Sequence, residues 1–193
     1  MIEKLAISLA DSVLNNASAG QREICIYGAE TAIRSIFSTA WLLAIGMLFG
    51  MTLNAAIIIA VFYINQTVGG GKHARTGLGC ITVMTAFMSS GLLILRFKPS
   101  LQICVAVGII SIFCLYINPL ILHHNKAHLS PLTPKLRSRS HVITSVMSVL
   151  FLLTVTLAKQ YNCAFSIGLL FSAVSRSIAI SESHLQFTHV RHF

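Results

Sequence analysis

Charged side chains are scarce in this sequence, and acidic ones are the scarcest. Asp, Glu, Lys and Arg make up 10% of the 193 residues, whereas soluble globular domains carry roughly 25%. This shortage excludes an ordinary soluble domain. Five acidic residues stand against 14 Lys and Arg, for a net charge of +9. The basic residues are scattered among short loops and form no continuous stripe, so they indicate cytoplasmic loops of a membrane protein rather than a nucleic-acid interface.

Clustered cysteines and metal-ligand patterns are lacking too. The five cysteines are odd in number, have no C-x-x-C spacing and mostly lie in apolar runs, which argues against a disulfide framework. We interpret four of them as small buried hydrophobic residues. Two groups of histidines match no zinc pattern, so we expect neither a metal nor another cofactor. These groups are His123, His124 and His128, and His184, His189 and His192.

What the sequence does contain is apolar runs. Apolar residues make up 55% of the chain, and runs of about 20 residues, the length needed to cross a bilayer, recur along most of it. We predict an all-α integral membrane protein of about six transmembrane helices, forming a single membrane-embedded domain over residues 1–193. The expected spans cover residues 26–49, 52–67, 78–97, 101–118, 141–158 and 163–180.

The two terminal segments are not expected to span the membrane. In residues 1–20, apolar side chains such as Ile2, Leu5 and Leu9 recur at helical spacing, and polar side chains lie mostly on the other face. This pattern predicts an amphipathic helix that lies at the membrane surface, or packs against the rest of the protein, or both. The His-rich residues 181–193 are expected to form a weakly ordered cytoplasmic tail.

The distribution of basic residues predicts the orientation. With six spans, both termini share one side of the membrane with the segments that follow the second and fourth spans. Ten Lys and Arg residues lie on that side and three on the other, so the positive-inside bias predicts a multi-pass protein of the cell membrane with both termini cytoplasmic. The ten are Lys4, Arg22, Arg34, Lys72, Arg75, Lys126, Lys135, Arg137, Arg139 and Arg191, and the three are Arg96, Lys98 and Lys159.

The segment from Gly69 to Cys80, GGGKHARTGLGC, combines a glycine-rich turn, a histidine and a cysteine at the start of an expected span. A thiol becomes a nucleophile when a neighbouring base takes its proton, and the first turn of a helix would further favour a thiolate. In one continuous helix the seven-residue step would separate the backbones of His73 and Cys80 by about 10 Å. The pair therefore requires a turn that folds His73 back, which the glycines permit.

Gly69-Gly70-x-x-His73 followed by Cys80 resembles the signature of the AgrB family (accessory gene regulator protein B), membrane cysteine endopeptidases of quorum-sensing systems. In that family, a histidine and a cysteine seven residues apart, just after a Gly-Gly turn, form the catalytic pair. The run from Tyr27 to Glu30 resembles the family's tyrosine-glycine-x-glutamate element, and the chain length, hydropathy pattern and basic, proline-bearing loop are similar. The sequence departs from the family pattern in having neutral residues six and seven positions before the histidine.

The resemblance implies a cysteine endopeptidase that cleaves an AgrD-like quorum-sensing propeptide at the cytoplasmic face. Cys80 would attack the scissile carbonyl, and His73 would accept the thiol proton and later protonate the leaving amine. Capture of the acyl-thioester by a cysteine or serine of the same peptide would release a ring. Five cations are candidates for binding an acidic peptide segment, although they equally fit a role in setting topology. They are Lys72, Arg75, Lys135, Arg137 and Arg139.

Two polar side chains are candidates for supporting roles. Glu30 could orient His73 as the third member of a triad, or form an i,i+4 ion pair with Arg34, and we favour the ion pair. Gln66 is a candidate for orienting the base or stabilising an oxyanion. Apart from the propeptide, we expect the lipid bilayer and a second copy of the chain as partners, and no nucleic acid. The alternative function is a small polytopic transporter or exporter of a peptide or other solute, without peptidase activity.

Overall fold

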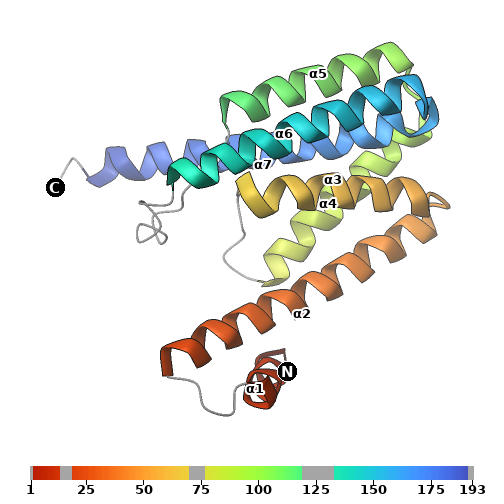
Figure 1. Ribbon diagram of the computed structural model, residues 1–193. Coiled ribbons are helices and arrows are strands. Elements are labelled where there is room, and N and C mark those ends of the chain that lie inside the picture. Colours follow the sequence, from red (N-terminus) through yellow and green to blue (C-terminus); the bar gives the residue numbers. More distant parts are fainter. Residues whose placement is uncertain (1, 14–18, 70–76, 119–132, 191–193) are drawn as a thin grey trace.

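The computed structural model describes residues 2–13, 19–69, 77–118 and 133–190, and the regular structure in these ranges is helical throughout (Figure 1). No strand occurs in them, which confirms the all-α prediction. The helices are α1 (Ile2–Val13), α2 (Ala19–Leu48), α3 (Thr52–Gly69), α4 (Gly77–Arg96), α5 (Leu101–Ile117), α6 (Thr133–Thr156) and α7 (Lys159–Val190).

Four of these helices are long and apolar enough to cross a bilayer. The qualifying segments are Gly28–Leu48, Gly79–Arg96, Arg137–Thr156 and Lys159–Ala179. Helices α3 and α5 are shorter but also apolar, at 18 and 17 residues, close to the lower limit of about 17 residues for a span. Large apolar side chains are exposed on both helices, as contact with lipid requires, among them Leu53 and Ile64 on α3 and Ile109, Ile110 and Phe113 on α5. The chain is therefore a membrane protein.

Helix α7 is the centre of the bundle. In its apolar segment 72% of the residues are buried, against 17% to 22% in the other three long segments. It packs mainly on α3 and α5, and also contacts α6 and α4. Close approach to α3 occurs at Gly168, where an added Cβ would lie 2.8 Å from the Cβ of Val61. Small residues of this kind allow transmembrane helices to pack without a hydrophobic driving force.

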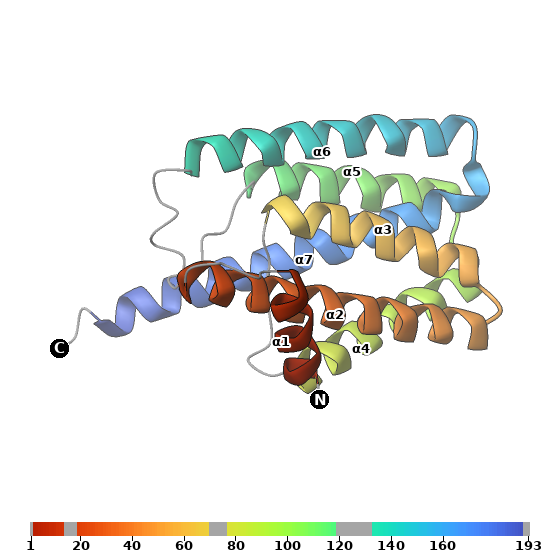
Figure 2. The same cartoon turned by 60° about the horizontal axis from the view of Figure 1, so that its bottom comes forward.

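The bundle has two ends, which can be followed in Figure 2. Helices α3 and α5 finish at one end, which we call the tail end because α7 continues beyond it as the C-terminal tail. At the other end, Cys104 in the first turn of α5 forms a disulfide with Cys163 near the start of α7, with Cα atoms 5.0 Å apart. We call this the disulfide end. The sequence interpretation of these two cysteines as simple apolar residues was wrong, because their proximity depends on how α5 and α7 pack.

Three helix boundaries differ from the sequence prediction. Helix α2 begins at Ala19 and α6 at Thr133, before residues 26 and 141, where we expected these spans to begin. Pro134 does not prevent this, because proline is tolerated in the first turn of a helix. Helix α7 continues into the tail as far as Val190. The order of that tail in solution stays a prediction.

Helix α1 lies across the N-terminal half of α2 in both views (Figures 1 and 2). Ala6 is fully buried in the contact, and Asp11 accepts two hydrogen bonds from the guanidinium of Arg22, at 2.8 and 3.1 Å. The packed arrangement anticipated for this segment is therefore present, and it is compatible with a position at the membrane surface.

Candidate active site

Cys80 lies in the first turn of α4, at the tail end of the bundle. Its thiol is free and half-buried. One turn further along the same face of α4, Met84 lines a small apolar cavity together with Leu42 of α2 and Tyr63 of α3. Cys80 therefore lies on the face of α4 that turns towards α2 and α3.

Helix α4 is fixed to α2 by a polar contact within the membrane. The indole nitrogen of Trp41 donates a hydrogen bond of 3.0 Å to the hydroxyl of Thr85. This contact lies between one and two turns from Cys80 along α4, so it helps to set where the thiol sits relative to α2.

His73, Lys72 and Arg75 lie outside the described residues. The described helices stop at Gly69 before this segment and resume at Gly77 after it. Helix α3 therefore leads into the segment that carries the predicted base, and α4 carries the predicted nucleophile directly after it. The contact between His73 and Cys80 stays a prediction.

Glu30 is half-buried on α2 and accepts a hydrogen bond from the guanidinium of Arg34, one turn along the same helix. This is the i,i+4 pair that we favoured from the sequence. Any role for Glu30 in orienting His73 would have to coexist with the pair.

Gln66 lies in the last turn of α3, close to the point where the chain leaves towards His73. Its side-chain nitrogen is buried and has no hydrogen-bond acceptor among the described residues. An unsatisfied buried donor costs about 1–3 kcal/mol, so an acceptor that reached this N–H group would be favoured.

The AgrB family model, whose description is Accessory gene regulator B, matches residues 2–176. The chain belongs to the AgrB family. No curated protein and no solved structure matches it. The matched range includes His73, Cys80, Glu30 and Gln66, and membership makes the chain a quorum-sensing-related membrane protein.

The described basic candidates of this AgrB-family chain lie on a helix, not in the loop where we expected them. Lys135, Arg137 and Arg139 are exposed on the first turns of α6. Lys135 and Arg139 share one face because they are four residues apart, whereas Arg137 lies on a different side of the helix. The three cations therefore do not form a single row.

One residue to which the sequence analysis gave no role is central to the tail end of this AgrB-family bundle. Arg176 of α7 is 1% exposed and donates hydrogen bonds to α3, α6 and the residue that caps α5. The signal that could have revealed it is an arginine inside an apolar run, because intramembrane charges are rare and face a specific partner.

Proposed function

We propose that the protein is a membrane cysteine endopeptidase that cleaves, and through a thioester cyclises, a quorum-sensing propeptide at the cytoplasmic face. The observation that carries the proposal is the family match over residues 2–176, which spans both His73 and Cys80. The free, half-buried thiol of Cys80 in the first turn of α4 supports it, because a nucleophile must be reachable by substrate yet sheltered from bulk water.

In the proposed reaction, His73 accepts the proton of the Cys80 thiol, and the sulfur attacks the scissile carbonyl of the peptide. The carbon–nitrogen bond then breaks, His73 returns the proton to the leaving amine, and the peptide stays attached through a thioester. A thiol or hydroxyl of the same peptide next attacks the thioester carbonyl and gives its proton to His73. The Cys80 sulfur leaves and recovers that proton, so the free enzyme is restored.

Groups on α3, α4 and α6 are suited to this chemistry. The N-terminus of α4 carries the positive end of the helix dipole, which favours negative charge nearby. The buried amide nitrogen of Gln66, in the last turn of α3, would serve as a donor for a developing oxyanion. The exposed cations Lys135 and Arg139 of α6 suit an acidic segment of the propeptide, as do Lys72 and Arg75.

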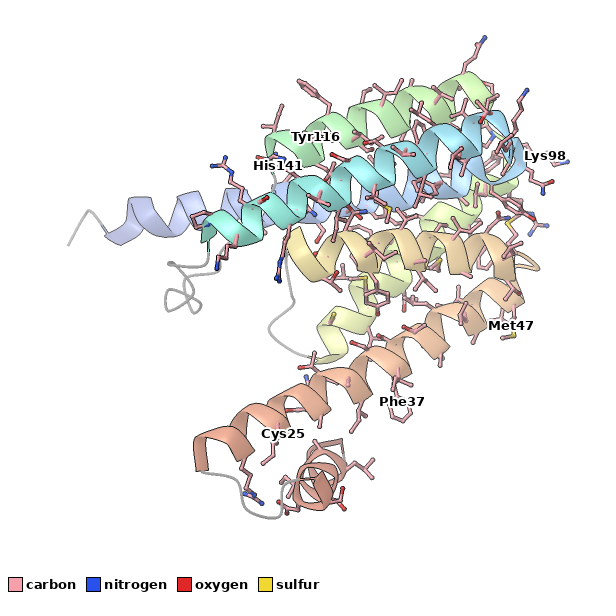
Figure 3. All side chains as sticks on the ribbon, viewed as in Figure 1. Cys25, Phe37, Met47, Lys98, Tyr116 and His141 are labelled. Carbon is pink, nitrogen blue, oxygen red and sulfur yellow. A yellow bond between two sulfur atoms is a disulfide. The ribbon has the colours of Figure 1, made fainter. Side chains whose placement is uncertain are left out.

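Two independent observations support placing the tail end in the cytoplasm. The first is the excess of basic residues on that side of the sequence map. The second is the chemistry of the cysteines, because disulfides persist in oxidising compartments and thiols in the cytosol. The Cys104–Cys163 disulfide lies at the opposite end, whereas the free cysteines Cys25, Cys80 and Cys114 lie towards the tail end. Figure 3 shows Cys25 and Lys98 at opposite ends of the molecule.

The test is cleavage of an AgrD-like propeptide by the purified protein in lipid nanodiscs, followed by mass spectrometry. Cys80→Ala and His73→Ala should both abolish cleavage, and Cys114→Ala, which removes a free thiol of α5, should keep it. A trapped thioester of Cys80 would support the covalent step. Cleavage by the Cys80→Ala protein would overturn the proposal, and solute transport retained in both variants would favour an exporter.

A further inference from the structure

Arg176 makes the most extensive polar contact in the described interior of the protein. One terminal nitrogen donates to the backbone carbonyl of Asn65 on α3 at 2.7 Å. The other donates to the carbonyl of Asn118, the C-cap residue of α5, at 3.3 Å, and to the hydroxyl of Ser140 on α6 at 3.4 Å. A single guanidinium therefore joins α7 to three other segments at the tail end.

The surroundings show that this is a built polar layer and not an incidental contact. Asn65 and Thr144 are fully buried, and Ser140 and Arg176 are each 1% exposed. Thr144 donates to the carbonyl of Ser140, and the amide of Asn65 donates to the carbonyl of Val61, so both side chains bond to the backbone of their own helix one turn earlier. Burial of an arginine within a membrane costs at least about 2.5–3.5 kcal/mol on insertion scales, which makes such a residue a candidate for function.

The guanidinium is placed where helix ends supply compensating charge. Helices α3 and α5 both present their C-terminal ends to Arg176, and the carbonyl end of a helix carries partial negative charge. The planar fork of an arginine can reach several acceptors in fixed directions, which the ammonium of a lysine cannot do. Arg176 therefore fixes the relative positions of these helix ends.

The end of α3 is also where the chain departs for the proposed catalytic base. The carbonyl of Asn65 lies four residues before Gly69, the last residue of α3, and eight residues before His73. Helix α4, which carries Cys80, packs more on α2 than on α3. Direct α3–α4 packing is therefore limited, and the hydrogen bond from Arg176 of α7 is a polar contact that ties the last turns of α3 to the rest of the bundle.

We propose that Arg176 is a positioning residue of the active site, which holds the end of α3 so that His73 is presented to Cys80. This inference rests on the proposed function, since it assumes that the two residues form a catalytic pair. The proposed role involves no contact between Arg176 and the substrate. Arg176 instead affects how readily the Cys80 thiol transfers its proton.

The experiment measures alkylation of Cys80 by iodoacetamide in the full-length protein in nanodiscs, quantified by peptide mass spectrometry. An ordinary thiol, with a pKa of about 8.5, is only about 1% thiolate at pH ~6.5. A thiol that has passed its proton to an imidazole is mostly thiolate, although its lower basicity offsets part of the gain in rate. His73→Ala should therefore slow alkylation of Cys80 roughly fivefold to tenfold at pH ~6.5, but should not slow it at pH ~9, where both thiols are mostly ionised.

Arg176→Met should lose most of the same low-pH rate and end within about twofold of His73→Ala. The double variant should be no slower than His73→Ala alone, because both changes remove one interaction. Arg176→Lys should fall between the wild type and Arg176→Met. The matched control is Arg96→Met, which removes an exposed arginine at the disulfide end and should leave the profile unchanged. Circular dichroism and Trp41 emission report whether each variant is folded.

The outcomes separate the two proposals. If His73→Ala leaves the low-pH rate unchanged, the catalytic pair is absent, and the proposed function and this inference both fail. If His73→Ala slows alkylation but folded Arg176→Met reacts like the wild type, only the role of Arg176 is overturned. If Arg176→Met does not fold, Arg176→Lys decides, and a wild-type rate at low pH in that variant overturns the inference.

Discussion

Substitution of Gly108 provides a quantitative test of how the helices pack. Gly108 of α5 faces the ring of Phe151 on α6, and an added Cβ would lie within 3.1 Å of three of its ring carbons. Ordinary carbon–carbon contacts are about 3.5–4.0 Å. Phe151 is 1% exposed and packs against Phe165 of α7, with ring centroids 6.2 Å apart, so the ring has little room to retreat. Overpacking of this kind costs about 1–3 kcal/mol.

Gly28 is the matched control within the same protein. It also lies inside a helix, α2, but an added Cβ there has no neighbour within 4 Å. Alanine is favoured over glycine in a helix by up to about 1 kcal/mol at either position. Gly28→Ala should therefore raise the free energy of unfolding, whereas Gly108→Ala should lower it or leave it unchanged. The two variants should differ by about 1–3 kcal/mol.

Thermal unfolding in detergent micelles, followed by circular dichroism, measures this difference. For a chain of this size, 1 kcal/mol corresponds to roughly 2–4 °C in Tm, so we expect a gap of roughly 2–12 °C between the variants. Adding Phe151→Leu to Gly108→Ala should cost less than the sum of the two single changes, because the smaller side chain makes room for the Cβ. Equal Tm values for Gly28→Ala and Gly108→Ala would refute the packing of α5 against α6.

The remaining predictions concern polar and covalent contacts. Cys104→Ala should lower the Tm by removing a cross-link to Cys163 across 59 residues, worth up to about 4 kcal/mol in the chain-entropy model, and reduction of the wild type should have the same effect. Thr85→Val should shift the emission of Trp41, the only tryptophan in the chain, because the indole loses its hydrogen bond; an unchanged spectrum would argue against the α2–α4 contact. Glu30→Gln should keep propeptide cleavage within about twofold, since an i,i+4 pair contributes only about 0.2–0.5 kcal/mol, and a loss above tenfold would instead support a triad.

The sequence alone determined the fold class and the approximate course of the chain through the membrane. Backbone N–H and C=O groups in lipid must be satisfied within the protein, so long apolar runs in series have essentially one solution, a set of helices. The ends of α4 and α5 also followed from local signals. Pro99 ends one helix, and Ser100 caps the next by accepting a hydrogen bond from the backbone N–H of Ile103.

Parts of the site followed from sequence for the same local reason. The glycines before Cys80 predicted a helix start, which the structure places at Gly77, and the spacing of Glu30 and Arg34 predicted their pairing. Lys135 to Arg139 were misplaced in a loop, because an exposed polar helix start has the composition of a loop. The residue pattern therefore could not distinguish the start of α6 from a loop.

Only the tertiary structure decided which helix ends come together. The sulfur atoms of Cys104 and Cys163 meet because α5 and α7 begin at the same end and lie side by side. Arg176 reaches Asn65 across 111 positions because α7 runs through the centre of the bundle. Hydropathy records only how far each segment prefers lipid to water. The choice of neighbours depends on where small and large side chains fit together, which is a property of pairs of helices.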